Sequence, residues 1–177
     1  SSTLLLWAKA TGAPRYIVHL LNKGGVEAVT QEKDEVYSCY AQICPQYLEF
    51  TSDVYKPENA RNFVCSPPMK GEESRQALWA AIRRGDIDTI ATDHCPFQSY
   101  EKDWGKDDFT KIPNGCAGIE NMYPYMLSAA NNGEITFGII THPVRNLWKR
   151  KQTSVQSPGQ KRPVHHCISS IWRIRAA

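Results

Sequence analysis

Residues 87–97 read Ile-Asp-Thr-Ile-Ala-Thr-Asp-His-Cys-Pro-Phe, so a short apolar strand leads directly into Asp93 and His94 before Pro96 stops it. A carboxylate at the end of a buried strand is costly to desolvate unless a group pairs with it, and a cation is the simplest partner. In barrels of parallel strands, catalytic residues collect at the C-terminal ends of the strands. Taken alone, the segment fits equally well an aspartate that caps the turn after its strand.

A histidine occupies a comparable place earlier in the chain. His19 lies in the apolar run Tyr-Ile-Val-His-Leu-Leu over residues 16–21, which is typical of a strand buried on both faces. A single histidine in such a run is more often a satisfied core residue than a metal ligand. His94 is not expected to bind a metal directly; it either orients a ligand or caps a helix.

The elements that would position these groups alternate between helix and strand. Gly24 and Gly25 indicate a turn, and Gly85 lies where a one-sided apolar helix would end. Strands are expected over 16–21, 36–43 and 87–92, and helices over 2–10, 26–31 and 72–84. This order predicts an α/β fold in which helical crossovers join parallel strands.

Charge is distributed unevenly along the 177 residues. Residues 139–177 contain eight Lys or Arg and no Asp or Glu, which leaves 13 of the 21 basic residues and all 18 acidic residues in 1–138. We expect the domain-like part of the chain to cover 1–137, followed by an irregular basic tail over 138–177 that is either disordered or read out of frame. A basic arm for nucleic acid is the alternative, but the tail lacks a motif with interleaved aromatic residues, so nucleic acid is not an expected partner.

Other features point to a cytoplasmic protein. The sequence has no run of eighteen apolar residues, so no membrane span is expected, and its start does not resemble a signal peptide. The six cysteines form no Cys-x-x-Cys pair, which favours reduced thiols over disulfides or a zinc finger. Lys102 and Lys106 are expected in a solvated loop.

Five motifs resemble those of the dihydropyrimidinase and D-hydantoinase (D-phenylhydantoinase) family, the cyclic-amidase branch of the metal-dependent amidohydrolases. They are Tyr-Ile-Val-His at 16–19, Ile-Cys-Pro-Gln-Tyr-Leu at 43–48, Val-Cys-Ser-Pro-Pro at 64–68, Ala-Thr-Asp-His-Cys-Pro-Phe at 91–97, and Asp-Asp-Phe-Thr-Lys-Ile-Pro-Asn-Gly at 107–115. The last is the most specific. The resemblance covers residues 1 to about 137 and implies a partial TIM-like (β/α)8 barrel, about strands 6–8 with their helices.

The resemblance also implies roles for four residues. His19 would bind a metal, and Asp93 would both bind metal and act as the catalytic proton shuttle. Ser66 and Asn114 would hold the amide edges of a cyclic substrate through their main-chain groups. The implied cofactor is a pair of divalent metals, usually zinc, which accepts imidazole and carboxylate ligands and activates water near neutral pH. The implied reaction opens the ring amide of a dihydropyrimidine or hydantoin to an N-carbamoyl amino acid.

The rest of the family's metal site cannot be placed in this sequence. The resemblance calls for three further histidines, a carboxylated lysine and a tyrosine that stabilises the oxyanion, and a barrel of this kind needs about 250 residues. We therefore expect the chain to be a fragment that is inactive alone. The alternative is a non-catalytic scaffold or oligomerisation protein of the same family. The intact relatives are expected to form homo-oligomers, commonly tetramers.

Overall fold

The computed structural model describes Trp7 and residues 10–34, 39–136 and 138. Three parallel strands, in the order β1-β2-β3, form a sheet. The elements are β1 (Arg15–Ile17), α2 (Lys23–Asp34), β2 (Cys39–Ile43), α3 (Gln46–Glu49), α4 (Glu72–Arg84), β3 (Thr89–Ile90), α5 (Ser99–Lys102) and α6 (Ile119–Asn131), with 3-10 turns at Ser52–Tyr55, Ala60–Phe63, Asp103–Gly105 and Phe109–Lys111. The predicted alternation of helices with parallel strands is confirmed.

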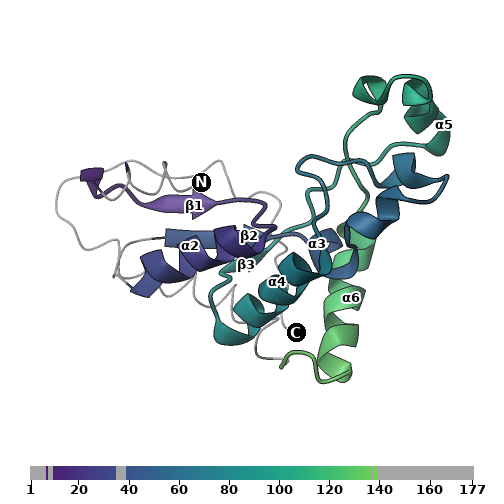
Figure 1. Ribbon diagram of the computed structural model, residues 1–177. Coiled ribbons are helices and arrows are strands. Elements are labelled where there is room, and N and C mark those ends of the chain that lie inside the picture. Colours follow the sequence, from purple (N-terminus) through teal and green to yellow (C-terminus); the bar gives the residue numbers. More distant parts are fainter. Residues whose placement is uncertain (1–6, 8–9, 35–38, 137, 139–177) are drawn as a thin grey trace, which may run out of the picture.

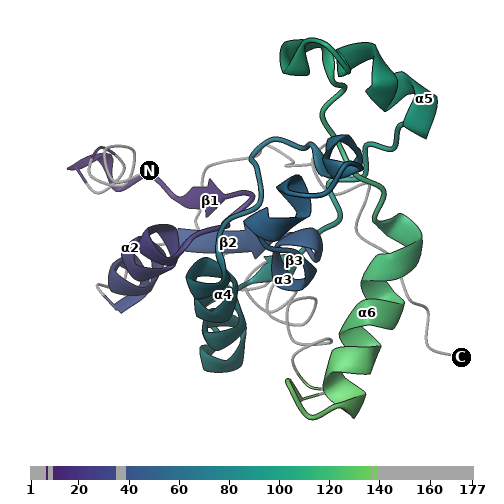
Figure 2. The same cartoon turned by 45° about the vertical axis from the view of Figure 1, so that its right-hand side comes forward.

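Helices α2 and α4 pack on one side of the sheet. Figures 1 and 2 show α2 and α4 side by side below the strands, with α6 beyond α4 and α5 at the far end from β1. The crossover β1–α2–β2 and the crossover from β2 through α4 to β3 thus place all three C-terminal strand ends along one edge of the sheet. Any chemistry at these ends is assembled from segments distant in sequence.

The predicted bounds differ from the observed ones in specific ways. The helix over 72–84 is confirmed, and Gly85 ends it in the left-handed conformation, at φ 84°. Gly24 and Gly25 were predicted to form a turn, but they lie in the first turn of α2. A Cβ on Gly25 would lie 2.9 Å from Leu20 Cδ1, so close packing against the preceding loop accounts for this glycine.

The strands are shorter than predicted because the chain turns early. β1 ends at Ile17 and β3 at Ile90, although hydrogen bonds from Leu20 N to Gln42 O and from Ala91 N to Ile43 O continue the contacts beyond both strands. Three predictions fall outside the described residues: the start of the second strand at 36–38, most of the helix at 2–10, and the basic tail after 138.

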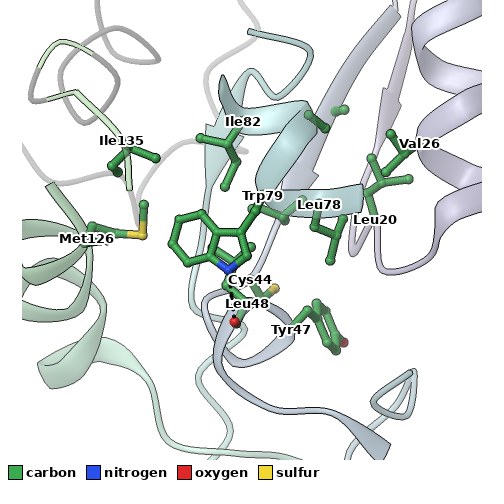
Figure 3. Packing of buried hydrophobic residues seen from close by; sticks show 14 of the residues in the cluster. Leu20, Val26, Cys44, Tyr47, Leu48, Leu78, Trp79, Ile82, Met126 and Ile135 are labelled. Carbon is green, nitrogen blue, oxygen red and sulfur yellow. Dashed lines mark hydrogen bonds between the residues drawn. The ribbon is translucent and has the colours of Figure 1, made fainter. Parts of the chain in front are cut away.

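Aliphatic side chains from β2, α2 and α4 form the core. Ala41 and Ile43 of β2 and Leu78 of α4 have no exposed surface. Figure 3 shows Trp79 reaching from α4 toward Met126 of α6, with its indole Nε1 donating a 3.2 Å hydrogen bond to Leu48 O. The core therefore joins the sheet to α6.

Candidate active site

Two residues at the strand ends have an unusual backbone. His19 and Asp93, at φ 54° and 48°, are the only non-glycine residues with positive φ in the described ranges. The left-handed region costs an L-residue roughly 1–2 kcal/mol. His19 comes two residues after β1 and Asp93 three residues after β3. The strain therefore falls on the two residues singled out as metal ligands.

These two side chains meet across the sheet edge. His19 Nδ1 lies 3.9 Å from Asp93 Oδ2, and their side chains are 30% and 44% exposed. The Sγ of Cys44, a fully buried residue just after β2, lies 3.5 Å from the same imidazole nitrogen. The structure thus brings His19 and Asp93 together at an edge that solvent and ligands can reach.

The end of the central strand holds both of these turns in place. Gln42 Oε1 accepts a 3.1 Å hydrogen bond from the main-chain N–H of His19. Gln46 Nε2 donates a 3.3 Å hydrogen bond to the carbonyl of Thr92, the residue before Asp93. Sequence reasoning missed these two glutamines. Gln42 carried a signal, because a polar side chain in an otherwise apolar strand must find partners when it is buried.

Ser66 and Asn114 form a second pair. Ser66 Oγ donates a 3.1 Å hydrogen bond to Asn114 Oδ1, and both residues are exposed. Gly115 N donates to Val64 O at 3.0 Å, so the two segments run beside each other. Within the described ranges, no hydrogen bond occupies the main-chain N–H or C=O of Ser66 or of Asn114. These groups are available to a ligand.

The loop around Asn114 connects this pair to the segment after Asp93. Cys95 N donates a 3.0 Å hydrogen bond to Cys116 O, and His94 pairs with Cys116 as an isolated parallel bridge. Gly115 has φ 154°, and a Cβ there would lie 2.3 Å from Cys95 O. Only glycine permits this close approach of the two segments.

Comparisons with known proteins agree with this arrangement. No protein-family model matches the chain. The chain is 37% identical over 131 residues to the D-hydantoinase of Streptomyces coelicolor and 36% identical over 129 residues to the D-phenylhydantoinase of Escherichia coli, in each case covering 72% of this chain and 28% of the relative. It superimposes on the dihydropyrimidinase of Brevibacillus agri with a TM-score of 0.76 and 28% identity, over 80% of this chain and 32% of that one.

This chain is a partial segment of the D-hydantoinase and dihydropyrimidinase family. It spans less than a third of the length of these relatives. Its three parallel strands and their helices match part of the solved structures. The resemblance carried by the five motifs is therefore confirmed.

The structure resolves the choice left open for His94. Its Nδ1 accepts hydrogen bonds from Gly118 N at 3.0 Å and Ile119 N at 3.3 Å, the first main-chain donors of α6. His94 therefore caps a helix, as one of the two alternatives held. A capping side chain satisfies donors that the helix itself leaves unpaired.

The prediction of a solvated Lys102 was wrong. Lys102 is 2% exposed, whereas Lys106 lies on the surface as predicted. The Lys102 ammonium group lies among main-chain carbonyls near the thiols of Cys65 and Cys116. Burial lowers the pKa of Lys102.

A pair of thiols adjoins this buried cation. The Cys65 thiol donates a 3.5 Å hydrogen bond to Pro67 O. Its interaction with Cys116, together with the positive charge of Lys102, lowers the pKa of Cys116 to about 7 against the opposing effect of burial. The same interaction and burial raise the pKa of Cys65. In the described ranges five cysteines are free thiols, namely Cys39, Cys44, Cys65, Cys95 and Cys116.

Among the described residues, no helix has the length and apolar character that a membrane crossing requires. Nor do these residues contain a cluster of three or more His, Cys, Asp or Glu side chains that could hold a metal ion. His19 and Asp93 are thus two candidate donors, and they do not form a complete ligand set.

Proposed function

We propose that this chain supplies part of a metal-dependent cyclic amidase that opens the ring amide of dihydropyrimidines or hydantoins to N-carbamoyl amino acids, and that it is inactive alone. The observation that carries the proposal is the meeting of His19 and Asp93, both strained, at the C-terminal edge of a parallel sheet. Backbone strain of this kind concentrates at functional sites, where the surrounding structure holds it. The relatives named hydantoinase and dihydropyrimidinase support the reaction class.

The donor atoms suit a divalent metal such as zinc. His19 and Asp93 would hold the ion through an imidazole nitrogen and a carboxylate oxygen, both of which are donor types that zinc accepts. The other ligands of a dinuclear zinc site would come from the part of the family's structure that this chain does not match. When bound, the metals would polarise the ring carbonyl and activate the attacking water at neutral pH.

The residues of this chain transfer the proton and orient the substrate. The Asp93 carboxylate, 44% exposed, takes a proton from the attacking water and delivers it to the leaving ring nitrogen. The main-chain groups of Ser66 and Asn114 pair with the N–H and C=O edges of the flat ring, which orients the scissile bond before reaction. Gln42 and Gln46 keep His19 and Asp93 facing each other.

The proposed barrel context also fits the open face of the sheet. Tyr16 of β1 and Val18 just after it are 50% and 49% exposed. Side chains alternate along a strand, so these two point away from the face that binds α2 and α4. In a closed barrel, the face of the sheet opposite the helices, which carries Tyr16 and Val18, is the packed interior. We propose that these strands are the sixth to eighth of such a barrel, with a homotetramer as the intact assembly.

The test combines the two parts of the protein. The full chain is co-expressed with the portion of the Streptomyces coelicolor D-hydantoinase that it does not match, the copurified assembly is analysed for zinc, and hydantoin ring opening is measured. We expect about two zinc ions per reconstituted subunit and ring opening by the assembly only. His19→Ala should lower the zinc content and Asp93→Asn should abolish turnover, while Glu58→Gln, on the surface, should change neither.

Two results would count against the proposal. Failure of the two parts to copurify would refute the shared barrel. An assembly that forms but binds no zinc and opens no ring would instead favour the non-catalytic scaffold. Full turnover by Asp93→Asn would remove that carboxylate from the reaction.

A further inference from the structure

Lys102 is a buried cation whose hydrogen bonds all go to main-chain oxygens. Its Nζ donates to Val64 O at 2.8 Å, to Pro113 O at 2.5 Å and to Gly115 O at 2.9 Å, which uses all three ammonium protons. The ring of Phe97 lies 5.3 Å from the same nitrogen. In the described part of the chain, no carboxylate lies within ion-pair distance of Lys102. A fully buried lysine without an acidic partner is rare in proteins.

The three carbonyls belong to the two segments that carry the candidate ring-binding residues. Val64 lies two positions before Ser66, while Pro113 and Gly115 flank Asn114. One ammonium group therefore joins both segments, and Val64 O accepts hydrogen bonds both from Lys102 and from Gly115 N. A neutral side chain of similar size would leave the inward carbonyls of Pro113 and Gly115 without this donor.

Peptide geometry determines where the remaining groups point. In a trans peptide the C=O of one residue and the N–H of the next point in opposite directions. Because Pro113 O points inward to Lys102, the N–H of Asn114 points outward, and Asn114 is exposed. That N–H has no hydrogen-bond partner in the described residues. The hydrogen bond from Lys102 to Pro113 O therefore fixes the outward direction of the Asn114 N–H.

Building on the proposed function, we propose that Lys102 is a positioning residue whose ammonium group holds the Ser66 and Asn114 segments so that their main-chain groups face the two edges of one cyclic amide. Lys102 does not contact the cyclic amide itself. It acts through three carbonyls, in a site that water hardly reaches, where a charge-assisted hydrogen bond is stronger than one at the surface.

The decisive measurement is hydrogen exchange at individual amides of the full chain. Lys102→Met keeps the length of the side chain and removes its charge, and Lys106→Met is the matched control at an exposed position. We expect exchange of the Gly115 amide to accelerate at least tenfold in Lys102→Met, with the amides of α4 unchanged. Lys106→Met should leave both unchanged. Equal acceleration in α4, or no change at Gly115, would overturn the proposal.

A second measurement covers the case in which Lys102→Met does not fold. In the wild-type chain, the ammonium protons of Lys102 should exchange with water at least tenfold more slowly than those of Lys106. Equal rates would refute the three hydrogen bonds. In the copurified assembly, Lys102→Met should lower kcat/KM at least tenfold while leaving the zinc content at the wild-type value.

The two proposals fail in different ways. An assembly without zinc and without ring opening ends the proposed function, yet the exchange rates still decide whether Lys102 holds the two segments. If Lys102→Met has a normal kcat/KM although exchange of the Gly115 amide is accelerated, the positioning role of Lys102 is refuted. The proposed cyclic-amidase function is not affected by that result.

Discussion

Replacing Gly115 by alanine tests the close approach on which the candidate site depends. The added Cβ would lie 2.3 Å from Cys95 O and 2.7 Å from Cys95 Cβ, where ordinary contacts begin at 3.4 Å. The atoms must therefore separate by about 1 Å, and one of them is a main-chain oxygen that cannot rotate away. The backbone at φ 154° is also one that alanine avoids.

The expected cost follows from two contributions. A φ/ψ region that is nearly restricted to glycine costs other residues about 1–3 kcal/mol. Separating the segments also weakens the bonds from Gly115 N to Val64 O and from Cys95 N to Cys116 O, each worth about 1 kcal/mol. Gly115→Ala should thus lower the free energy of unfolding by about 4 kcal/mol, a large part of the roughly 5–15 kcal/mol available to a domain.

Urea denaturation followed by circular dichroism measures this loss. Gly24→Ala is the control, because a Cβ at Gly24 meets only Asn22 Oδ1 at 4.0 Å, within a helix that alanine favours. We expect that control to be neutral or to stabilise the chain by up to about 1 kcal/mol. If Gly115→Ala cost less than about 1 kcal/mol, the 95 and 115 segments would not be packed as described.

Three further predictions concern the site itself. Asp93→Asn should lower turnover of the copurified assembly at least a hundredfold, roughly the value of a positioned proton-transfer group. Ser66→Ala should change kcat/KM less than about tenfold, because only a neutral hydrogen bond of about 1 kcal/mol is lost while the main-chain groups stay. Alkylation of Cys116 by iodoacetamide, followed by peptide mass spectrometry, should rise with pH around a midpoint near 7, because the thiolate is the reacting form and the pKa of Cys116 is lowered to about 7. Cys65→Ala should move that midpoint to higher pH, since the interaction with Cys65 that lowers the pKa of Cys116 is lost, and a wild-type midpoint near 9 would contradict that interaction.

The sequence was most informative where local pattern and global fold agree. The helix over 72–84 has one apolar face and a glycine positioned to end it, and the structure has the same bounds. Parallel strands were expected from the alternation of short apolar runs with helices. From parallel strands alone it follows that residues after β1 and β3 share one edge, which is why His19 and Asp93 meet.

Lys102 shows what a single sequence cannot reveal. Its partners are main-chain carbonyls of residues 64, 113 and 115, and every residue type offers such an oxygen. No pattern of side chains in the sequence indicates this buried environment, and a lysine between Glu101 and Asp103 is typical of a surface residue. The prediction was wrong because the fold of two distant loops, rather than local polarity, determines the environment of this ammonium group.

The strain at the strand ends gives the strongest physical reason to assign a site there. Two residues in the left-handed region cost roughly 2–4 kcal/mol together, and glycine could adopt the same conformation without that cost. Glycine, however, carries neither an imidazole nor a carboxylate. Gln42 fixes the N–H of His19, and Gln46 fixes the carbonyl just before Asp93, so the strained turns are held from the central strand and its following helix. Ending two strands does not call for such strain, and the arrangement fits the proposed role of His19 and Asp93 as two ligands directed at one point.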